Sequence, residues 1–211
     1  FAPVSEFELV EQSENAVTLR LVSNADTKRQ YPFAFIFDVS YRLDENGFST
    51  IFAVTNPAKE EMLFGIGGHP GCSPLEDYEI DFGKEITLDS LVVDKDFYIT
   101  SDTKRILDRE RILPLRRELF AEDALIFEEP PFDSVILRNR RNGHGIRFSF
   151  QGFSSFAVWS QTEDADFVCL EPWNSMGKRP GEGTELADKK DIITLPAGGR
   201  LECSYRIEPV G

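Results

Sequence analysis

Apolar and polar residues alternate along much of the chain, which is the pattern of β-strands that bury one face. The clearest examples are residues 17–21 and 33–41, where apolar side chains occupy every second position. Between Leu43 and Val54, the pair Asn46-Gly47 is a tight-turn signal and predicts a β-hairpin. The same pattern predicts further strands over these segments: 7–10, 62–66, 78–82, 125–127, 134–139, 145–150, 157–160, 167–170 and 201–207.

Helical periodicity is weak by comparison. Segments 116–123 and 182–190 are each expected to form a turn or two, and no apolar stripe at helical spacing lasts for three turns. Eighteen phenylalanines indicate a broad core between two packed sheets, because each ring removes a large apolar area from water. The pattern therefore predicts an all-β fold. Since no repeat or linker interrupts it, residues 1–211 are expected to form one domain, with 67–77 and 172–190 as functional loops.

The chain has 211 residues and a formal net charge of -14. A chain this acidic repels phosphate backbones and anionic lipid heads, so neither nucleic acid nor a membrane is expected as a partner. Its three cysteines, Cys72, Cys169 and Cys203, lack the spacing of a disulfide framework or a CxxC zinc site. We therefore expect free thiols and a cytoplasmic location, which the lack of a signal-peptide pattern in residues 1–10 also favours.

Two histidines limit any chemistry that needs an imidazole. His144 lies in a glycine-containing segment between two predicted strands and is expected in an exposed turn. His69 follows the run Gly65-Ile66-Gly67-Gly68 and precedes Pro70, so a strand is expected to end there, where glycines let a ligand approach closely. The alternative interpretation of His69 is a side chain that satisfies a hydrogen bond in a turn.

Glu171 is the candidate acid of the chain, because it ends a strongly β segment and directly precedes Pro172. A period of two places Phe167, Cys169 and Glu171 on one face of the strand. Because proline cannot continue a hydrogen-bonded ladder, the strand is expected to end here, with the carboxylate at a sheet edge or the mouth of a site. The alternative is an acid that points to solvent or pairs with an arginine.

Three segments resemble, in order and spacing, the aldose 1-epimerase (galactose mutarotase-like) superfamily, and its short bacterial branch above all. They are Ile66–Pro70 followed by Pro74-Leu75, Asp123–Phe127, and Val168–Trp173. The resemblance extends over residues 6–207. It implies a large antiparallel β-sandwich of the supersandwich type. It also implies an isomerase that interconverts the α and β anomers of a free hexose by opening the sugar ring and reclosing it on either face.

The resemblance also implies roles for four residues. His69 would be the general acid that protonates the ring oxygen, and Glu171 the general base that takes the proton of the anomeric hydroxyl. Trp173 would offer a flat apolar face to the sugar, and Asp123 would accept a hydrogen bond from a sugar hydroxyl. Such proton exchange needs neither a metal nor a cofactor, so none is expected. A carboxylate and an imidazolium favour each other's charged forms, so an ionised Glu171 is expected.

The sequence departs from the family pattern at its beginning. In the family, an N-terminal third precedes the matching region and supplies strands and an arginine that contacts sugar hydroxyls. Here the chain begins after that region, so either a fragment or a shortened protein is expected, with the sandwich lacking its N-terminal strands. The expected partner is a small aldose sugar, and the expected assembly is a monomer or a homodimer. The main alternative function is a noncatalytic carbohydrate-binding or sugar-sensing protein on the same fold.

Other chemical interpretations of the same residues remain open. Cys72 and His69 are three residues apart and could form a nucleophilic site. His69 with Glu76 and Asp77 could bind a metal, although this set lacks a second nitrogen or sulfur ligand.

The arginine-rich stretches 105–117 and 138–147 are expected to be solvated faces that balance the acidic surface. Recognition of a hexose phosphate is the alternative for them.

Overall fold

The computed structural model describes residues 2–72, 77–161 and 165–211. Its helical elements are α1 (Ala25–Gln30) and three 3-10 turns, η1 (Ala2–Val4), η2 (Arg117–Phe120) and η3 (Leu186–Asp188). Its strands are β1 (Glu8–Gln12), β2 (Ala16–Val22), β3 (Ile36–Asp44), β4 (Gly47–Thr55), β5 (Met62–Phe64), β6 (Gly71–Cys72), β7 (Tyr78–Val93), β8 (Ile99–Pro114), β9 (Leu125–Glu128), β10 (Ser134–Asn139), β11 (Gly145–Gln151), β12 (Ser155–Trp159), β13 (Val168–Trp173), β14 (Ile193–Leu195) and β15 (Arg200–Val210).

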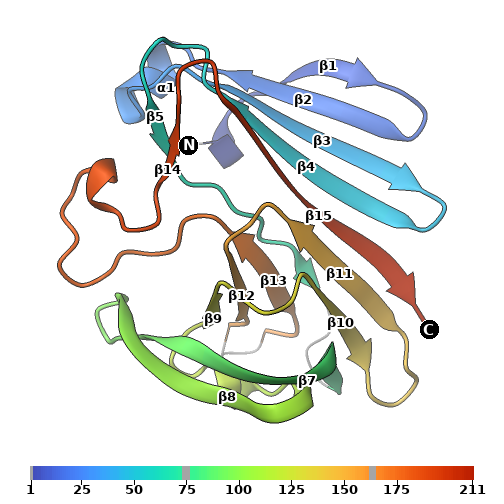
Figure 1. Cartoon of the computed structure of the whole chain (residues 1–211). Helices are drawn as coiled ribbons and strands as arrows, with labels where there is room; N and C mark the ends of the chain where they lie inside the picture. Colours follow the sequence, from blue (N-terminus) through green and yellow to red (C-terminus); the bar gives the residue numbers. More distant parts are fainter. Residues whose placement is uncertain (1, 73–76, 162–164) are drawn as a thin grey trace.

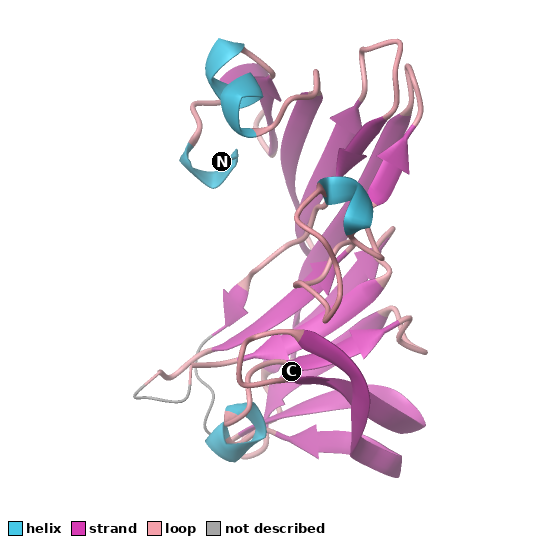
Figure 2. Ribbon diagram, turned by 90° about the vertical axis from the view of Figure 1, so that its left-hand side faces the viewer, coloured by secondary structure: helices cyan, strands magenta, loops and turns pink. Residues whose placement is uncertain are grey.

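Over the described residues, these strands form one antiparallel sheet of 13 strands and a second sheet of two. The order in the large sheet is β1-β2-β3-β4-β15-β11-β10-β7-β9-β12-β13-β6, with β8 paired to β7. Strands β5 and β14 make the small sheet (Figure 1). Helical turns are few and short, as Figure 2 shows. The predicted all-β, antiparallel fold is confirmed.

The large sheet bends so that its far half packs against its middle. Phe150 of β11 and Phe156 of β12 stack with ring centroids 4.9 Å apart, although three strands separate β11 from β12 in the sheet. Phe148 of β11 also lies 6.0 Å from Phe156. These rings belong to the larger hydrophobic core, to which strands β7 to β13 contribute buried side chains. The core therefore lies between two layers of one curved sheet, which is how this chain forms the predicted sandwich.

A second core lies under the first strands of the chain. Leu21 of β2, Phe35 and Val54 pack here against Met62 and Phe64 of β5. The small sheet covers this part of the large one. Strands within residues 8–55 therefore pack against β5, the strand that leads directly to His69.

Local sequence signals predicted the first hairpin. Strands β3 and β4 pair with Asp44 opposite Gly47, so the turn consists of the two residues between them. The Asp44 carboxylate accepts hydrogen bonds from the backbone N–H groups of Asn46 and Gly47, at 2.9 and 3.0 Å. Residues between β2 and β3 form the short helix α1, whose first N–H groups are capped by the side chain of Asn24.

The long hairpin of β7 and β8 is the main element that the sequence pattern did not predict. Only residues 78–82 were expected in a strand, whereas β7 and β8 each span 16 residues. Strand β8 carries charges on seven of its 16 positions, and its pairing with β7 shifts register at several points. An exposed, charged edge strand with such irregularities shows no regular alternation of apolar residues. Segments 116–123 and 182–190 each contain one 3-10 turn, as expected.

None of the helices in the described part of the chain is long and apolar enough to cross a membrane.

Candidate active site

Strand β13 carries Glu171 and lies between β12 and the segment that contains His69. Leu170 donates a backbone hydrogen bond to the Pro70 carbonyl at 3.1 Å, and Gly68 donates one to the Pro172 carbonyl at 2.9 Å. The expectation that the strand ends at Glu171 is wrong, since pairing with β12 continues to Trp173. Pro172 is tolerated because the N–H and C=O of a strand residue point to the same side. Its missing N–H therefore faces the irregular segment at Gly68 rather than β12.

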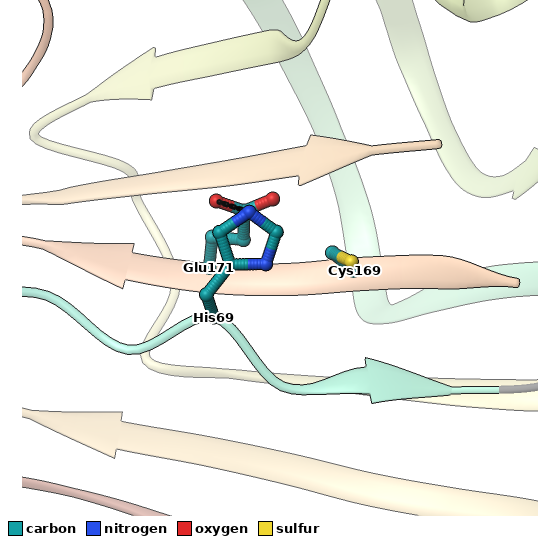
Figure 3. Close-up of side chains that lie close together, drawn as sticks. All are labelled: His69, Cys169 and Glu171. Carbon is teal, nitrogen blue, oxygen red and sulfur yellow. Dashed lines mark ion pairs between the residues drawn. The ribbon is translucent and has the colours of Figure 1, made fainter. Parts of the chain in front are cut away.

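His69 and Glu171 are in direct contact. The Nε2 atom of His69 lies 3.3 Å from Oε2 of Glu171, as Figure 3 shows. The Glu171 side chain is 2% exposed and that of His69 is 61% exposed. The alternative of a solvent-facing or arginine-paired Glu171 is therefore wrong. Two side chains that the sequence suggested separately form one pair at the surface, with the carboxylate beneath the imidazole.

The electrostatics of Glu171 differ from the expectation. Burial raises the pKa of Glu171 to about 7, a hydrogen-bond interaction with Trp173 lowers it, and the negative charge of Asp123 raises it. We expected His69 to favour the ionised carboxylate, but the cost of placing a charge in a buried position dominates. A carboxyl group with a pKa near neutrality can both take and return a proton at neutral pH.

Trp173 lies beside Glu171 in a partly packed position. It is half-buried against a small core of Ile126, Ala157 and other apolar residues. On another side it touches Gly67, with which it also forms an isolated β-bridge. The indole is thus held next to the carboxylate by its neighbours.

Asp123 also lies near Glu171, since its charge contributes to the pKa of that carboxyl group. Its backbone has a φ of 101°, which is unfavourable for a residue with a β-carbon. The Asp123 carboxylate accepts a hydrogen bond from the Ala124 N–H at 2.7 Å. The structure therefore brings His69, Glu171 and Trp173 together, and it places Asp123 within electrostatic range of Glu171.

Two further residues at this place were not assigned a function from the sequence. The ring of Trp159 lies edge-on to His69, with centroids 5.9 Å apart. Cys169 lies opposite Trp159 in the pairing of β13 with β12 and on the same face as Glu171, as the period of two predicted. Cys169 could have been found from the sequence, because it lies two residues before Glu171 on the same strand. No local signal could find Trp159, because its position depends on how β12 and β13 are aligned.

The competing interpretations receive less support. Burial raises the pKa of the Cys72 thiol, which disfavours the thiolate that a nucleophilic site needs. Asp77 forms ion pairs with Arg140 and Arg141. Glu76, like Pro74 and Leu75 of the family motif, lies outside the described residues.

Several arginines of the arginine-rich stretches pair with acids of β7. Arg111 and Arg138 both pair with Asp81, and Arg105 pairs with Asp89, all on the β7–β8 side of the sheet. His144 is exposed, as expected.

Comparison with known proteins shows which family and which proteins the chain is similar to. Residues 1–186 match the family model described as aldose 1-epimerase. The plasmid and chromosomal forms of Protein LacX from Lactococcus lactis subsp. lactis are each 33% identical to the chain over 220 residues, which is 98% of this chain and 73% of each relative. A galactose mutarotase related enzyme from Lactobacillus acidophilus has a TM-score of 0.91 at 28% identity, over 100% of this chain and 73% of that one.

A galactose mutarotase-like protein from Lactobacillus casei also has a TM-score of 0.91, at 25% identity and over 100% of this chain and 75% of that one. The family match and the two LacX relatives agree with the family resemblance that the sequence indicated. The chain therefore belongs to the aldose 1-epimerase family.

Proposed function

We propose that the protein is an aldose 1-epimerase that interconverts the α and β anomers of a free hexose, with His69 as the acid and Glu171 as the base. The observation that carries this proposal is the 3.3 Å contact between His69 Nε2 and Glu171 Oε2. A carboxylate and an imidazole at this distance can serve two sugar oxygens attached to the same carbon. Family membership supports the same reaction.

In the proposed reaction, Glu171 takes the proton from the hydroxyl on C1 while His69 gives a proton to the ring oxygen. The bond between C1 and the ring oxygen breaks, and its electron pair stays on that oxygen as the C1 aldehyde forms. Rotation about the bond from C1 to C2 presents the other face of the aldehyde. The ring oxygen then attacks C1, His69 recovers its proton, and Glu171 returns the other proton to the new hydroxyl.

The difference in exposure between the two side chains suits these roles. Because the Glu171 carboxylate is 2% exposed and His69 is 61% exposed, a sugar would approach from the side of the imidazole. Because the two groups touch, the ring is proposed to lie over the pair rather than between them. Trp159, edge-on to His69, would lie at the border of the bound sugar.

Polarimetry of a freshly dissolved α-aldose tests the proposal. The wild-type protein should speed the approach to the anomeric equilibrium, and Glu171→Gln and His69→Asn should each lower the rate by at least about a hundredfold. Matched controls are His144→Asn, which changes the exposed histidine, and Glu122→Gln, which changes a 67% exposed acid. Both controls should keep the wild-type rate.

Two results would contradict the proposal. One is a wild-type protein that binds aldoses without raising the rate above that of buffer, which would favour the carbohydrate-binding alternative. The other is full activity in folded Glu171→Gln or His69→Asn.

A further inference from the structure

Cys169 makes the His69–Glu171 pair into a cluster of three metal-ligating side chains. One ligand atom from each of His69, Cys169 and Glu171 lies within 4.8 Å of the other two (Figure 3). Cys169 and Glu171 are two residues apart on β13, so both side chains point to the same face. The metal set that the sequence suggested around His69 had no second nitrogen or sulfur ligand. The strand pairing supplies a sulfur that is 100 residues away along the chain.

One distance in this cluster already equals that between two ligands of a tetrahedral zinc ion. Zinc bonds of about 2.0–2.3 Å hold neighbouring ligand atoms about 3.3–3.6 Å apart. His69 Nε2 and Glu171 Oε2 are already 3.3 Å apart. The ligand atoms of the cluster lie within 4.8 Å of one another, so each separation from the thiol must shorten by at most about 1.2 Å to reach the same range.

The identity and access of the ligands favour a particular class of cation. A thiolate, an imidazole and a carboxylate together suit Zn²⁺ and similar borderline metals, whereas Mg²⁺ and Ca²⁺ prefer oxygen ligands alone. Cys169 and Glu171 are 3% and 2% exposed, so an ion bound there would be shielded from water on one side. The exposed imidazole of His69 provides the path by which a metal could enter. Three protein ligands leave a fourth position open to water.

We propose that His69, Cys169 and Glu171 bind one Zn²⁺ ion and that this ion inhibits the enzyme. The inhibition rests on the proposed function, because the ion would occupy the nitrogen and oxygen atoms that exchange protons with the sugar. Binding replaces the proton of the Cys169 thiol, which is released to the solvent as the sulfur–zinc bond forms. The binding itself does not depend on catalysis, so the two can be measured separately.

The test begins with metal-free protein prepared with a chelator and titrated with Zn²⁺ in a calorimeter. The expected result is one ion per chain, with an affinity that falls at least tenfold in Cys169→Ala. Cys72→Ala is the matched control, because Cys72 is a half-buried cysteine of β6 that lies opposite Val168 of β13. The Zn²⁺ affinity of this variant should equal that of the wild type. His69→Gln is a second variant, at a side chain that is 61% exposed, and its Zn²⁺ affinity should also fall at least tenfold. Titration with Co²⁺ should give a thiolate charge-transfer absorption band that Cys169→Ala removes.

The outcomes separate this inference from the proposed function. Absence of Zn²⁺ binding, or equal binding by the wild type and both Cys169→Ala and His69→Gln, would overturn the metal site whether or not the protein is an epimerase. Binding through Cys169 in a protein without epimerase activity would support the site and contradict the proposed function. If the protein is active, Zn²⁺ should inhibit the wild type at concentrations at least tenfold lower than those that inhibit Cys169→Ala. Equal inhibition of the two would overturn the inhibitory part.

Discussion

Gly67 and Trp173 approach so closely that a β-carbon added to Gly67 would lie 2.6 Å from Cδ1 of the indole. Trp173 in turn interacts through its side chain with the carboxylate of Glu171. The backbone before His69 therefore touches the side chain that sits beside the proposed base. One short contact couples the two segments that carry the candidate active site.

Gly67→Ala should displace Trp173. Because overpacking of this kind costs about 1–3 kcal/mol, the variant should unfold at a lower denaturant concentration and show a changed tryptophan fluorescence spectrum. Gly71→Ala is the matched control in the same segment, since its β-carbon would meet its nearest neighbour, Cys169 Sγ, at an ordinary 3.7 Å. Equal stability and equal spectra for the two variants would contradict the close contact.

Epimerase activity in metal-free buffer should rise with pH through about 7. Burial raises the pKa of Glu171 to about 7, and the base accepts a proton only when it is ionised, so activity is lost as the pH falls through this value. Trp173→Phe removes a hydrogen-bond donor that lowers this pKa, so its activity profile should shift to higher pH. Trp159→Phe, which alters the ring beside His69, should leave the midpoint in place. The measurement is kcat/KM by polarimetry, and activity that stays constant through neutral pH would disagree.

Asp81 should contribute stability that acid removes. Its side chain is 1% exposed and accepts hydrogen bonds from Arg111 at 2.6 and 2.7 Å, which hold its pKa below the usual value. Because the folded pKa is lower than the unfolded one, this stability is fully present above about pH 4 and is lost as the pH falls through the folded pKa. Asp81→Asn should cost about 1–3 kcal/mol at neutral pH and progressively less in acid.

The control for Asp81 is Asp89→Asn on the same hairpin. Asp89 pairs with Arg105 but is 40% exposed, so its loss should cost less than about 1 kcal/mol. Urea unfolding at several pH values measures both variants. A cost for Asp81→Asn that does not change between neutral and acidic pH would count against the buried pair.

Phe156→Ala should be among the most destabilising substitutions in the chain. Phe156 is fully buried and packs on Phe148 and Phe150 from the opposite layer, so its removal leaves a cavity that costs about 3–5 kcal/mol. Phe97→Ala, at a 77% exposed phenylalanine, should change stability by less than about 0.5 kcal/mol. Similar unfolding midpoints for the two variants would mean that β11 and β12 do not pack face to face.

Properties that depend on neighbours along the chain could be predicted from the sequence. Alternation of period two predicted most strands, and it placed Cys169 and Glu171 on one face because successive strand residues point to opposite sides. Asp44, Asn46 and Gly47 form their turn with local hydrogen bonds, so that hairpin was also predictable. The motifs that contain His69 and Glu171 indicated the family, which the comparison confirms.

Only the tertiary structure decided which of these residues are in contact and how their neighbours change their pKa values. The contact of His69 with Glu171, and the place of Trp159 beside it, follow from the alignment of segments far apart in the sequence. The pKa of Glu171 depends on burial by those segments, and for that reason the local expectation of a readily ionised carboxylate failed. The long strand β8 was not predicted for a related reason. Its mostly exposed residues show no regular alternation of buried and exposed positions, and its pairing with β7 makes it a strand. Local periodicity reports which face a side chain takes, whereas contact and burial depend on which distant strand is packed against that face.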